Sequence, residues 1–376
     1  MVVIDAAFDG GNIHCVDASN PADIRLEIAR DRQSDFYQWF SFRVCAEAGD
    51  PIKLVITNAG GAAYPKGWEN YRPVMSVDGK TWARIPAHYD GGTLTVDMTM
   101  PSPRVHLAYF APYTLVQHDA LISSAIATGR FGYQNLGQTV DGRAMDYLRY
   151  GSGNIPVWLI ARQHPGESMA EWWMEGAFEM LSDAADPISA ALADIATLHI
   201  IPNMNPDGSF RGHLRTNAVG VNLNRVWDTP DPERAPEVFH VRQKMEETGV
   251  DLCLDVHGDE ALPYNFIAGF EGIPGITEAQ LDGLNGYKAL LAQLTPDFQT
   301  KIGYPATPPG KANLSMATNY IAHRFGAVAM TLEMPFKDTT DTPNPQTGWS
   351  PPRCKHLARH CLHALLLQLT GTNIPS

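Results

Sequence analysis

The chain has 376 residues, enough for two domains of ordinary size, so a hydrophobic core can form without disulfides or structural metals. Apolar residues make up 44% of the sequence and charged residues 18%, which excludes disordered, fibrous and coiled-coil classes. The formal net charge is −13 and no basic stripe is present, so we expect neither nucleic acid nor an anionic membrane as a partner.

The N-terminus and the cysteines bear on the cellular compartment. Residues 1–9 contain no basic leader and no long apolar run, so we expect no secretory signal, no membrane span and a cytoplasmic location. The five cysteines are an odd number and lack the spacing of a metal finger. We therefore expect them to be reduced, structural thiols.

The first third of the chain has the pattern of short strands. Apolar and polar residues alternate through residues 26–28, 40–44 and 94–100. Gly, Asn and Asp residues separate these stretches. Such residues favour turns because they accept positive φ. This pattern predicts an antiparallel β-sandwich domain over residues 1–112.

Beyond residue 112 the pattern changes to helices alternating with continuous apolar strands. Such alternation predicts an α/β domain over residues 113–376, with helices covering both faces of its sheet. The expected strands are 157–161, 197–201, 251–256, 266–269 and 327–332. The expected helices are 115–128, 168–181, 236–248, 277–294 and 352–369.

The first chemical signal follows the strand that ends at Ala161. After this strand come His164, a Pro-Gly turn and Glu167. The side chains of His164 and Glu167 can therefore both project at the carboxyl end of the sheet. Imidazole and carboxylate are zinc ligands, and open α/β sheets place their sites at this edge. Because helices often begin with an acidic residue, this pair alone is weak evidence for a metal.

A second strand brings another histidine to the same edge. Residues 251–256 lead into His257, with Asp255 two positions before it. A catalytic zinc ion takes three protein ligands and leaves one position for water, and His164, Glu167 and His257 would complete that set. Asp255 is a candidate for orienting His257. The alternative is a strand-end histidine that is hydrogen-bonded to backbone.

Two arginines, Arg215 and Arg225, stand with Asn224 in an amide-rich loop that contains glycine. A guanidinium group is preorganised to bind carboxylates, so this segment predicts an anion site. The alternative is a solvated loop in which Arg225 pairs with Asp228 or Asp231.

The last apolar strand, residues 327–332, runs directly into Glu333. A carboxylate at the end of a buried strand is costly unless it is paired or lies near a cation. A general base beside a metal-bound water is one such arrangement. The alternative is a rim carboxylate that ends the strand before Pro335.

Taken together, the motifs resemble those of the M14-type zinc carboxypeptidases, and more closely their cytosolic carboxypeptidase branch. The matching segments are His164-Pro-Gly-Glu167, Asn205-Pro-Asp-Gly208, Arg215 with Val221-Asn-Leu-Asn-Arg225, Asp255-Val-His257-Gly258 and Thr331-Leu-Glu333. The β-rich first third also resembles that branch, which carries a β-sandwich ahead of its peptidase domain. The implied fold is a mixed-sheet zinc carboxypeptidase α/β domain preceded by an antiparallel β-sandwich.

The resemblance implies one Zn²⁺ per chain, held by His164, Glu167 and His257. It implies that Glu333 activates the zinc-bound water and later protonates the leaving amine. Arg215 matches the arginine that stabilises the carbonyl oxyanion.

By the same resemblance, Asn224 and Arg225 grip the terminal carboxylate of the substrate. The implied function is a zinc metallocarboxypeptidase that hydrolyses the C-terminal peptide bond of peptides or protein tails. The cytosolic branch trims glutamates, which implies a preference for acidic residues and a nearby cation, for which the candidates are Arg211, Lys311 and Arg324.

Three points stay open at this stage. Secreted members carry a mobile tyrosine before the catalytic acid, and Tyr320 stands in that region, but its segment predicts a helix core. A zinc amidohydrolase acting on N-acyl amino acids or cell-wall peptides could use the same residues. An inactive peptide-binding protein is the third alternative.

Overall fold

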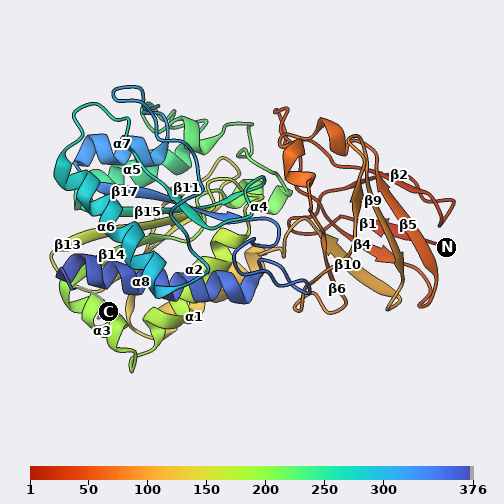
Figure 1. Ribbon diagram of the computed structural model, residues 1–376, viewed down its shortest axis with the longest axis horizontal. Coiled ribbons are helices and arrows are strands. Elements are labelled where there is room, and N and C mark those ends of the chain that lie inside the picture. Colours follow the sequence, from red (N-terminus) through yellow and green to blue (C-terminus); the bar gives the residue numbers. More distant parts are fainter. Residues whose placement is uncertain (373–376) are drawn as a thin grey trace.

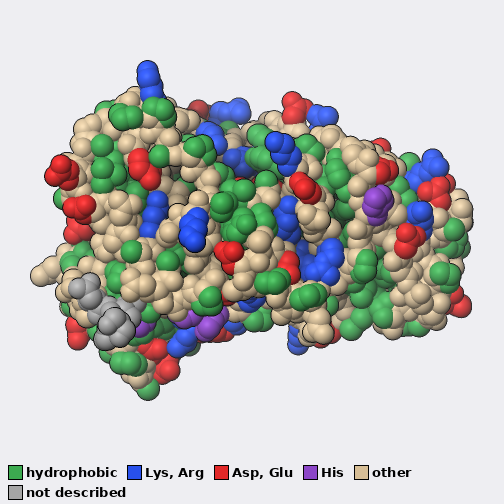
Figure 2. All heavy atoms as spheres, in the orientation of Figure 1, with side chains coloured by type: hydrophobic (Ala, Val, Ile, Leu, Met, Phe, Trp, Pro, Cys, Tyr) green, Lys and Arg blue, Asp and Glu red, His purple; other side chains and the backbone are tan. Residues whose placement is uncertain are grey.

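The computed structural model describes residues 1–372, which form two lobes lying side by side (Figure 1). The smaller lobe holds the red and orange N-terminal strands, and the larger lobe holds the rest of the chain. The division predicted between residues 112 and 113 stays a prediction, and it falls between β10 (Arg104–Ala108) and α1 (Leu115–Ala127). On the face shown in Figure 2, acidic and basic side chains are interspersed.

The smaller lobe contains two five-stranded sheets, whose strand orders are β1-β4-β10-β6-β7 and β2-β3-β5-β9-β8. Besides β10, the first sheet contains β1 (Val3–Asp5), β4 (Ser41–Cys45), β6 (Val74–Ser76) and β7 (Ala83–Arg84). The second contains β2 (His14–Asp17), β3 (Ile24–Glu27), β5 (Pro51–Ile56), β8 (His88–Tyr89) and β9 (Leu94–Thr99). The expected alternation is seen in β3, where Ile24 and Leu26 are buried between exposed neighbours. The β3–β5 pair is parallel, whereas the other strand pairs found in these two sheets are antiparallel.

The larger lobe is built on a seven-stranded mixed sheet of order β11-β12-β14-β13-β15-β17-β16. Its central neighbours β14, β13, β15 and β17 are parallel, and the strands at both edges are antiparallel. The strands are β11 (Phe131–Gln138), β12 (Ala144–Tyr150), β13 (Ile155–Ala161), β14 (Ala196–Ile201), β15 (Leu252–Asp259), β16 (Phe266–Ala268) and β17 (Val328–Pro335). The mixed α/β fold is therefore confirmed, and its five expected strands are present.

Helices cover the sheet on both faces, with α5 and α7 above it and α1 and α8 below it in the view of Figure 1. Local capping explains several helix ends, because Thr114 and Thr277 each form a capping box with the glutamine three residues later. Besides α1, the helices are α2 (Met169–Ser182), α3 (Pro187–Ile195), α4 (Pro206–Arg211), α5 (Pro236–Thr248), α6 (Glu278–Leu294), α7 (Ala317–Phe325) and α8 (Pro351–Thr370). None of the helices in residues 1–372 is both long and apolar enough to cross a membrane.

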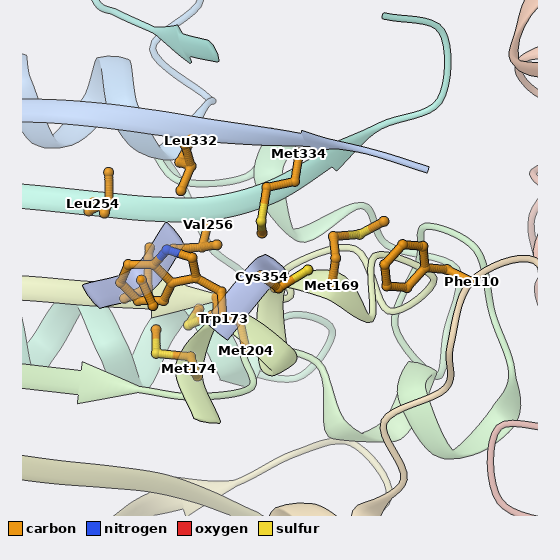
Figure 3. Packing of buried hydrophobic residues seen from close by; sticks show 14 of the residues in the cluster. Phe110, Met169, Trp173, Met174, Met204, Leu254, Val256, Leu332, Met334 and Cys354 are labelled. Carbon is orange, nitrogen blue, oxygen red and sulfur yellow. The ribbon is translucent and has the colours of Figure 1, made fainter. Parts of the chain in front are cut away.

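The core of the larger lobe lies between the central strands and the α2–α8 pair (Figure 3). Trp173 and Met174 of α2 and Cys354 of α8 are fully buried beside Val256 of β15 and Met334 of β17. All five cysteines are free, as expected. This packing fixes the central strands, whose carboxyl ends carry the site described below.

A buried arginine ties the two lobes together. Arg84 of β7 is only 7% exposed, and its guanidinium donates to the carbonyl oxygens of Phe336, Trp349, Thr347 and Arg72. Burial lowers the pKa of Arg84 to about 10, so the side chain is charged at neutral pH. Four carbonyl acceptors take the place of a carboxylate partner and satisfy a buried cation.

Candidate active site

Strand register brings the candidate residues to one place. In the parallel pair of β15 and β17, His257 lies directly opposite Glu333. His164 and Glu167 follow the neighbouring strand β13, in the turn that leads into α2. The residues line a cavity of about 400 Å³ at the carboxyl edge of the sheet, as expected for an open α/β sheet.

The turn that carries His164 is held by a residue in a strained conformation. Arg162 has a φ of +58°, which is rare for residues other than glycine. Its buried guanidinium donates to the carbonyl oxygens of Tyr113 (2.8 Å) and Pro165 (2.9 Å) and pairs with Glu171. Glu171 also contacts His118, whose other nitrogen lies 3.0 Å from a carboxylate on β12. This buried network compensates for the strain and fixes the direction of the turn.

His164, Glu167 and His257 form a compact group whose possible ligand atoms all lie within 4.8 Å of one another. The Nδ1 atoms of His164 and His257 are 3.2 Å apart, and they lie 2.7 and 2.8 Å from the two carboxylate oxygens of Glu167. The Nε2 atom of His164 faces the side-chain oxygen of Asn222 at 3.1 Å, and that of His257 faces Asp255 at 3.0 Å. With both Nε2 atoms protonated to donate to these acceptors, the Nδ1 atoms present lone pairs.

Two imidazole nitrogens and a carboxylate that converge in this way form the His₂Glu set that suits Zn²⁺. Although burial opposes it, Asp255 and Glu167 raise the pKa of His257 well above its usual value, so a positive charge is favoured here. Burial lowers the pKa of His164 to about 3, so this histidine is neutral and able to act as a ligand at pH 7. The chemistry of the donor set therefore fits a zinc ion.

A chain of buried hydrogen bonds supports His257 from behind. Asp255 is 1% exposed, and its Oδ2 also accepts a hydrogen bond from Nε2 of Gln163 at 2.6 Å. The indole of Trp227 donates to Oε1 of Gln163 at 2.8 Å, which fixes the orientation of that amide. The orienting role expected for Asp255 is consistent with these contacts.

Glu333 is 7% exposed at the floor of the cavity. Burial raises the pKa of its carboxyl group well above the usual range, and the neighbouring acids Glu167, Asp259 and Glu260 contribute in the same direction. Its Oε2 has no hydrogen-bond partner among the described residues. A buried carboxyl group with a free oxygen beside the candidate metal ligands has the features of a general base.

Arg215, Asn224 and Arg225 line the same cavity. Asn224 is held by the amide of Ala317, which donates to its Oδ1 at 2.8 Å, and Arg225 donates to the carbonyl oxygen of Asn224 at 2.6 Å. Burial and the nearby charge of Arg215 lower the pKa of Arg225. Within residues 1–372 no ion pair joins Arg225 to Asp228 or Asp231, so the pairing in the alternative interpretation is not found, although Arg225 is exposed. Two cations in one cavity favour an anionic ligand.

Comparison with known proteins supports the interpretation of this geometry. Residues 128–352 match the family model for zinc carboxypeptidases of the M14 type, and residues 4–110 match the model for the cytosolic carboxypeptidase N-terminal domain. The chain belongs to the M14 zinc carboxypeptidases. It is an enzyme of the metallocarboxypeptidase class.

Relatives of this M14 chain include solved bacterial enzymes. A metallo-carboxypeptidase from Burkholderia cenocepacia is 42% identical, with a TM-score of 0.96 over 99% of this chain and 100% of that one. A metallo-carboxypeptidase from Pseudomonas aeruginosa, solved with (2-guanidinoethylmercapto)succinic acid, is 42% identical with a TM-score of 0.95 over 98% and 100% of the two chains. Cytosolic carboxypeptidase 6 of Caenorhabditis elegans is 26% identical over 89% of this chain and 79% of its own length.

The cations suggested for an acidic substrate side chain lie outside the M14 cavity. Arg211 pairs with Asp141, and Arg324 pairs with Glu246. Lys311 is exposed and does not line the cavity. The cations among the lining residues are therefore Arg215 and Arg225.

Tyr320 lies in α7, as its pattern predicts, and its ring packs near Trp227. A different tyrosine, Tyr304, lines the cavity, and its hydroxyl lies 2.6 Å from Asp259 and 3.4 Å from Glu333. Tyr304 lies in a Gly- and Pro-rich loop between two helices, and this position is the feature of the sequence that could have indicated a functional role.

Sequence reasoning also missed two further lining residues, Tyr64 and Glu260. Tyr64 belongs to the smaller lobe, 100 residues before the candidate zinc ligand His164, so no local motif could place it. Glu260 follows Asp259 at the end of β15, where it reads as an ordinary polar residue in a turn.

Proposed function

We propose that the chain is a zinc-dependent exopeptidase that hydrolyses the C-terminal peptide bond of peptides or protein tails. The observation that carries this proposal is the shared cavity, in which Asn224 and Arg225 lie with His164, Glu167 and His257. A guanidinium beside an amide is suited to bind a free carboxylate. A substrate bound there by its terminal carboxylate would expose its last peptide bond to the metal group.

His164, Glu167 and His257 would hold one Zn²⁺, which when bound lowers the pKa of a water molecule to about 7 and polarises the scissile carbonyl. The chain itself then moves the protons and stabilises the charge. Glu333 takes a proton from the attacking water at its unpaired Oε2 and delivers a proton to the leaving nitrogen. Arg215 donates to the carbonyl oxygen as negative charge develops on it.

The preference for a C-terminal glutamate is the finer part of the proposal. Its support is the likeness to the cytosolic branch, together with the two cavity cations, Arg215 and Arg225. A glutamate side chain would pair with Arg215 or Arg225. It would then share Arg215 with the carbonyl oxygen of the scissile bond, or Arg225 with the terminal carboxylate of the substrate.

A specific observation favours a second candidate, a preference for basic C-terminal residues. Asp259 and Glu260 line the cavity close to the candidate zinc ligands, although burial raises the pKa of the Glu260 carboxyl well above its usual range. The compound bound to the Pseudomonas aeruginosa relative carries a guanidino group on a succinic acid, which is a cation joined to carboxylates.

The test uses the zinc-loaded full chain and matched peptides ending in Glu, Lys or Phe, each with a free or an amidated C-terminus. We expect release of the last residue from free peptides alone, and loss of release when zinc is chelated. Glu333→Gln should retain zinc while kcat falls about 10²- to 10⁴-fold. Glu247→Gln, on an exposed helix face, is the matched control.

Each alternative has its own result in this assay. Equal turnover of amidated peptides, or cleavage of N-acyl amino acids without cleavage of peptides, contradicts the exopeptidase and favours an amidohydrolase. Zinc binding without turnover of any substrate favours a binding protein. The ranking of Glu against Lys decides between the two side-chain preferences.

A further inference from the structure

The loop that carries Arg215 is held by the smaller lobe. Asp31, between β3 and β4, is 2% exposed, and its carboxylate accepts four hydrogen bonds from three consecutive residues of the larger lobe. The donors are the backbone N–H of Leu214 (2.6 Å), of Arg215 (2.8 Å) and of Thr216 (2.9 Å), and the hydroxyl of Thr216 (3.0 Å). The carboxylate therefore fixes the backbone on both sides of Arg215 as well as at Arg215 itself.

The Arg215 side chain is also held from the smaller lobe. The rings of Phe36 and Tyr64 have their centroids 5.6 and 5.4 Å from the guanidinium carbon, within the range of cation–π attraction. In the described part of the chain, the guanidinium donates no hydrogen bond to protein, and it faces the cavity. The rings thus hold the charge in position while its N–H groups remain free for a substrate oxygen.

The same loop has further contacts to the smaller lobe. Nε2 of His213 accepts from the backbone N–H of Arg32 at 3.1 Å, and Asn12 donates to the carbonyl oxygen of Gly212 at 2.8 Å. Gly220 has a φ of +79°, and a Cβ built there would lie 2.3 Å from the carbonyl oxygen of Gln33. These contacts leave the loop little freedom to move relative to Asp31.

We propose that Asp31 is a positioning residue for Arg215, and that the smaller lobe is a working part of the active site through Asp31, Phe36 and Tyr64. This inference rests on the proposed function, in which Arg215 stabilises the developing oxyanion. Such stabilisation depends on donors that are fixed in place before the reaction, because a small displacement weakens the bond to the transition state. The smaller lobe supplies that fixation across the domain boundary.

The test is a double-mutant cycle on the zinc-loaded full chain with Asp31→Asn and Arg215→Ala. Asp31→Asn keeps the size of the side chain but turns an amide N–H toward backbone N–H donors. We expect it to lower kcat about 10- to 100-fold, less than the 10²- to 10³-fold typical for loss of an oxyanion donor, with KM and zinc content nearly unchanged. In the Arg215→Ala background it should lower kcat no further, because the group that it positions is gone.

Two further variants keep the inference falsifiable. Asp35→Asn removes an exposed carboxylate that pairs with Arg30 in the same loop, and it should leave kcat unchanged. Phe36→Leu keeps an apolar side chain but removes the ring, and it should lower kcat roughly 2- to 5-fold even if Asp31→Asn fails to fold.

The outcomes distinguish a failure of the positioning role of Asp31 from a failure of the proposed function. If Asp31→Asn lowers kcat by the same factor with and without Arg215, or lowers only the thermal midpoint, Asp31 is an ordinary interface residue and the positioning role is overturned. If the wild-type chain releases no C-terminal residue from any peptide, the proposed function fails and the positioning role fails with it.

Discussion

The contacts of Asp255 allow the effect of one substitution to be worked out. Its Oδ2 lies 3.0 Å from Nε2 of His257 and 2.6 Å from Nε2 of Gln163, while Oδ1 has no partner among the described residues. Asp255→Asn keeps the shape of the side chain but removes the negative charge. That charge makes the imidazole of His257 a better electron donor through its Nε2–H group.

The expected loss is about 10- to 100-fold in zinc affinity, the range typical of such outer partners, or about 1.4 to 2.7 kcal/mol. Trp227 fixes the amide of Gln163, so the new side chain must turn its oxygen toward both existing donors. Its NH₂ group then occupies the place of Oδ1, which accepts no hydrogen bond from the described residues.

The assay is a competition for zinc between the apo protein and a chromophoric chelator at fixed pH. Asp251→Asn, an exposed carboxylate just before the same strand, is the matched control and should bind zinc as the wild type does. If Asp255→Asn and Asp251→Asn bind zinc equally well, the carboxylate does not act through His257, and the ligand geometry inferred above is wrong.

Three other outcomes follow from the structure. Arg225→Gln should raise KM about 10- to 200-fold for free peptides with little change in kcat, since a charge-assisted hydrogen bond contributes about 1.5 to 3 kcal/mol. An unchanged KM in steady-state assays would show that Arg225 does not bind the terminal carboxylate of the substrate. Although burial opposes it, the carboxylates of Glu171 and Asp146 raise the pKa of His118 to about 10. The free energy of unfolding should therefore fall between about pH 6.5 and pH 10, by at most about 1.4 kcal/mol per pH unit, and urea titrations of His118→Gln should lack this slope. Gly176→Ala should lower the thermal midpoint despite the better helix propensity of alanine, because the new Cβ would lie 2.4 Å from the backbone of Lys355; Gly286→Ala, which meets only the flexible end of a glutamine, should not.

The convergence of His164, Glu167 and His257 could be predicted because both histidines follow apolar runs that the sequence shows. His164 and His257 come just after apolar runs, and parallel strands deliver their carboxyl ends to one edge of the sheet. Glu333 was proposed by the same logic, and the register places it opposite His257.

The parts that sequence reasoning missed depend on contacts between distant segments or lack a periodic signal. β11 and β12 form an edge hairpin, and β11 is largely exposed, so its sequence shows no clear alternation of apolar and polar residues. Asp31 and Tyr64 reach Arg215 only because the two lobes dock. No propensity or spacing within either segment encodes that docking.

The buried arginine between the lobes bears on how the chain folds during synthesis. Arg84 is made early, but its acceptors at Phe336 and Trp349 follow 252 and 265 residues later. At typical ribosomal speeds of about 5 to 20 residues per second, this interval lasts roughly 13 to 50 s. The N-terminal sheets can pair in that time, but their guanidinium must stay hydrated at an open surface. The smaller lobe can therefore complete its contacts at Arg84 only after Phe336 and Trp349 have been synthesised. Truncated or stalled nascent chains should be good substrates for chaperones and proteases.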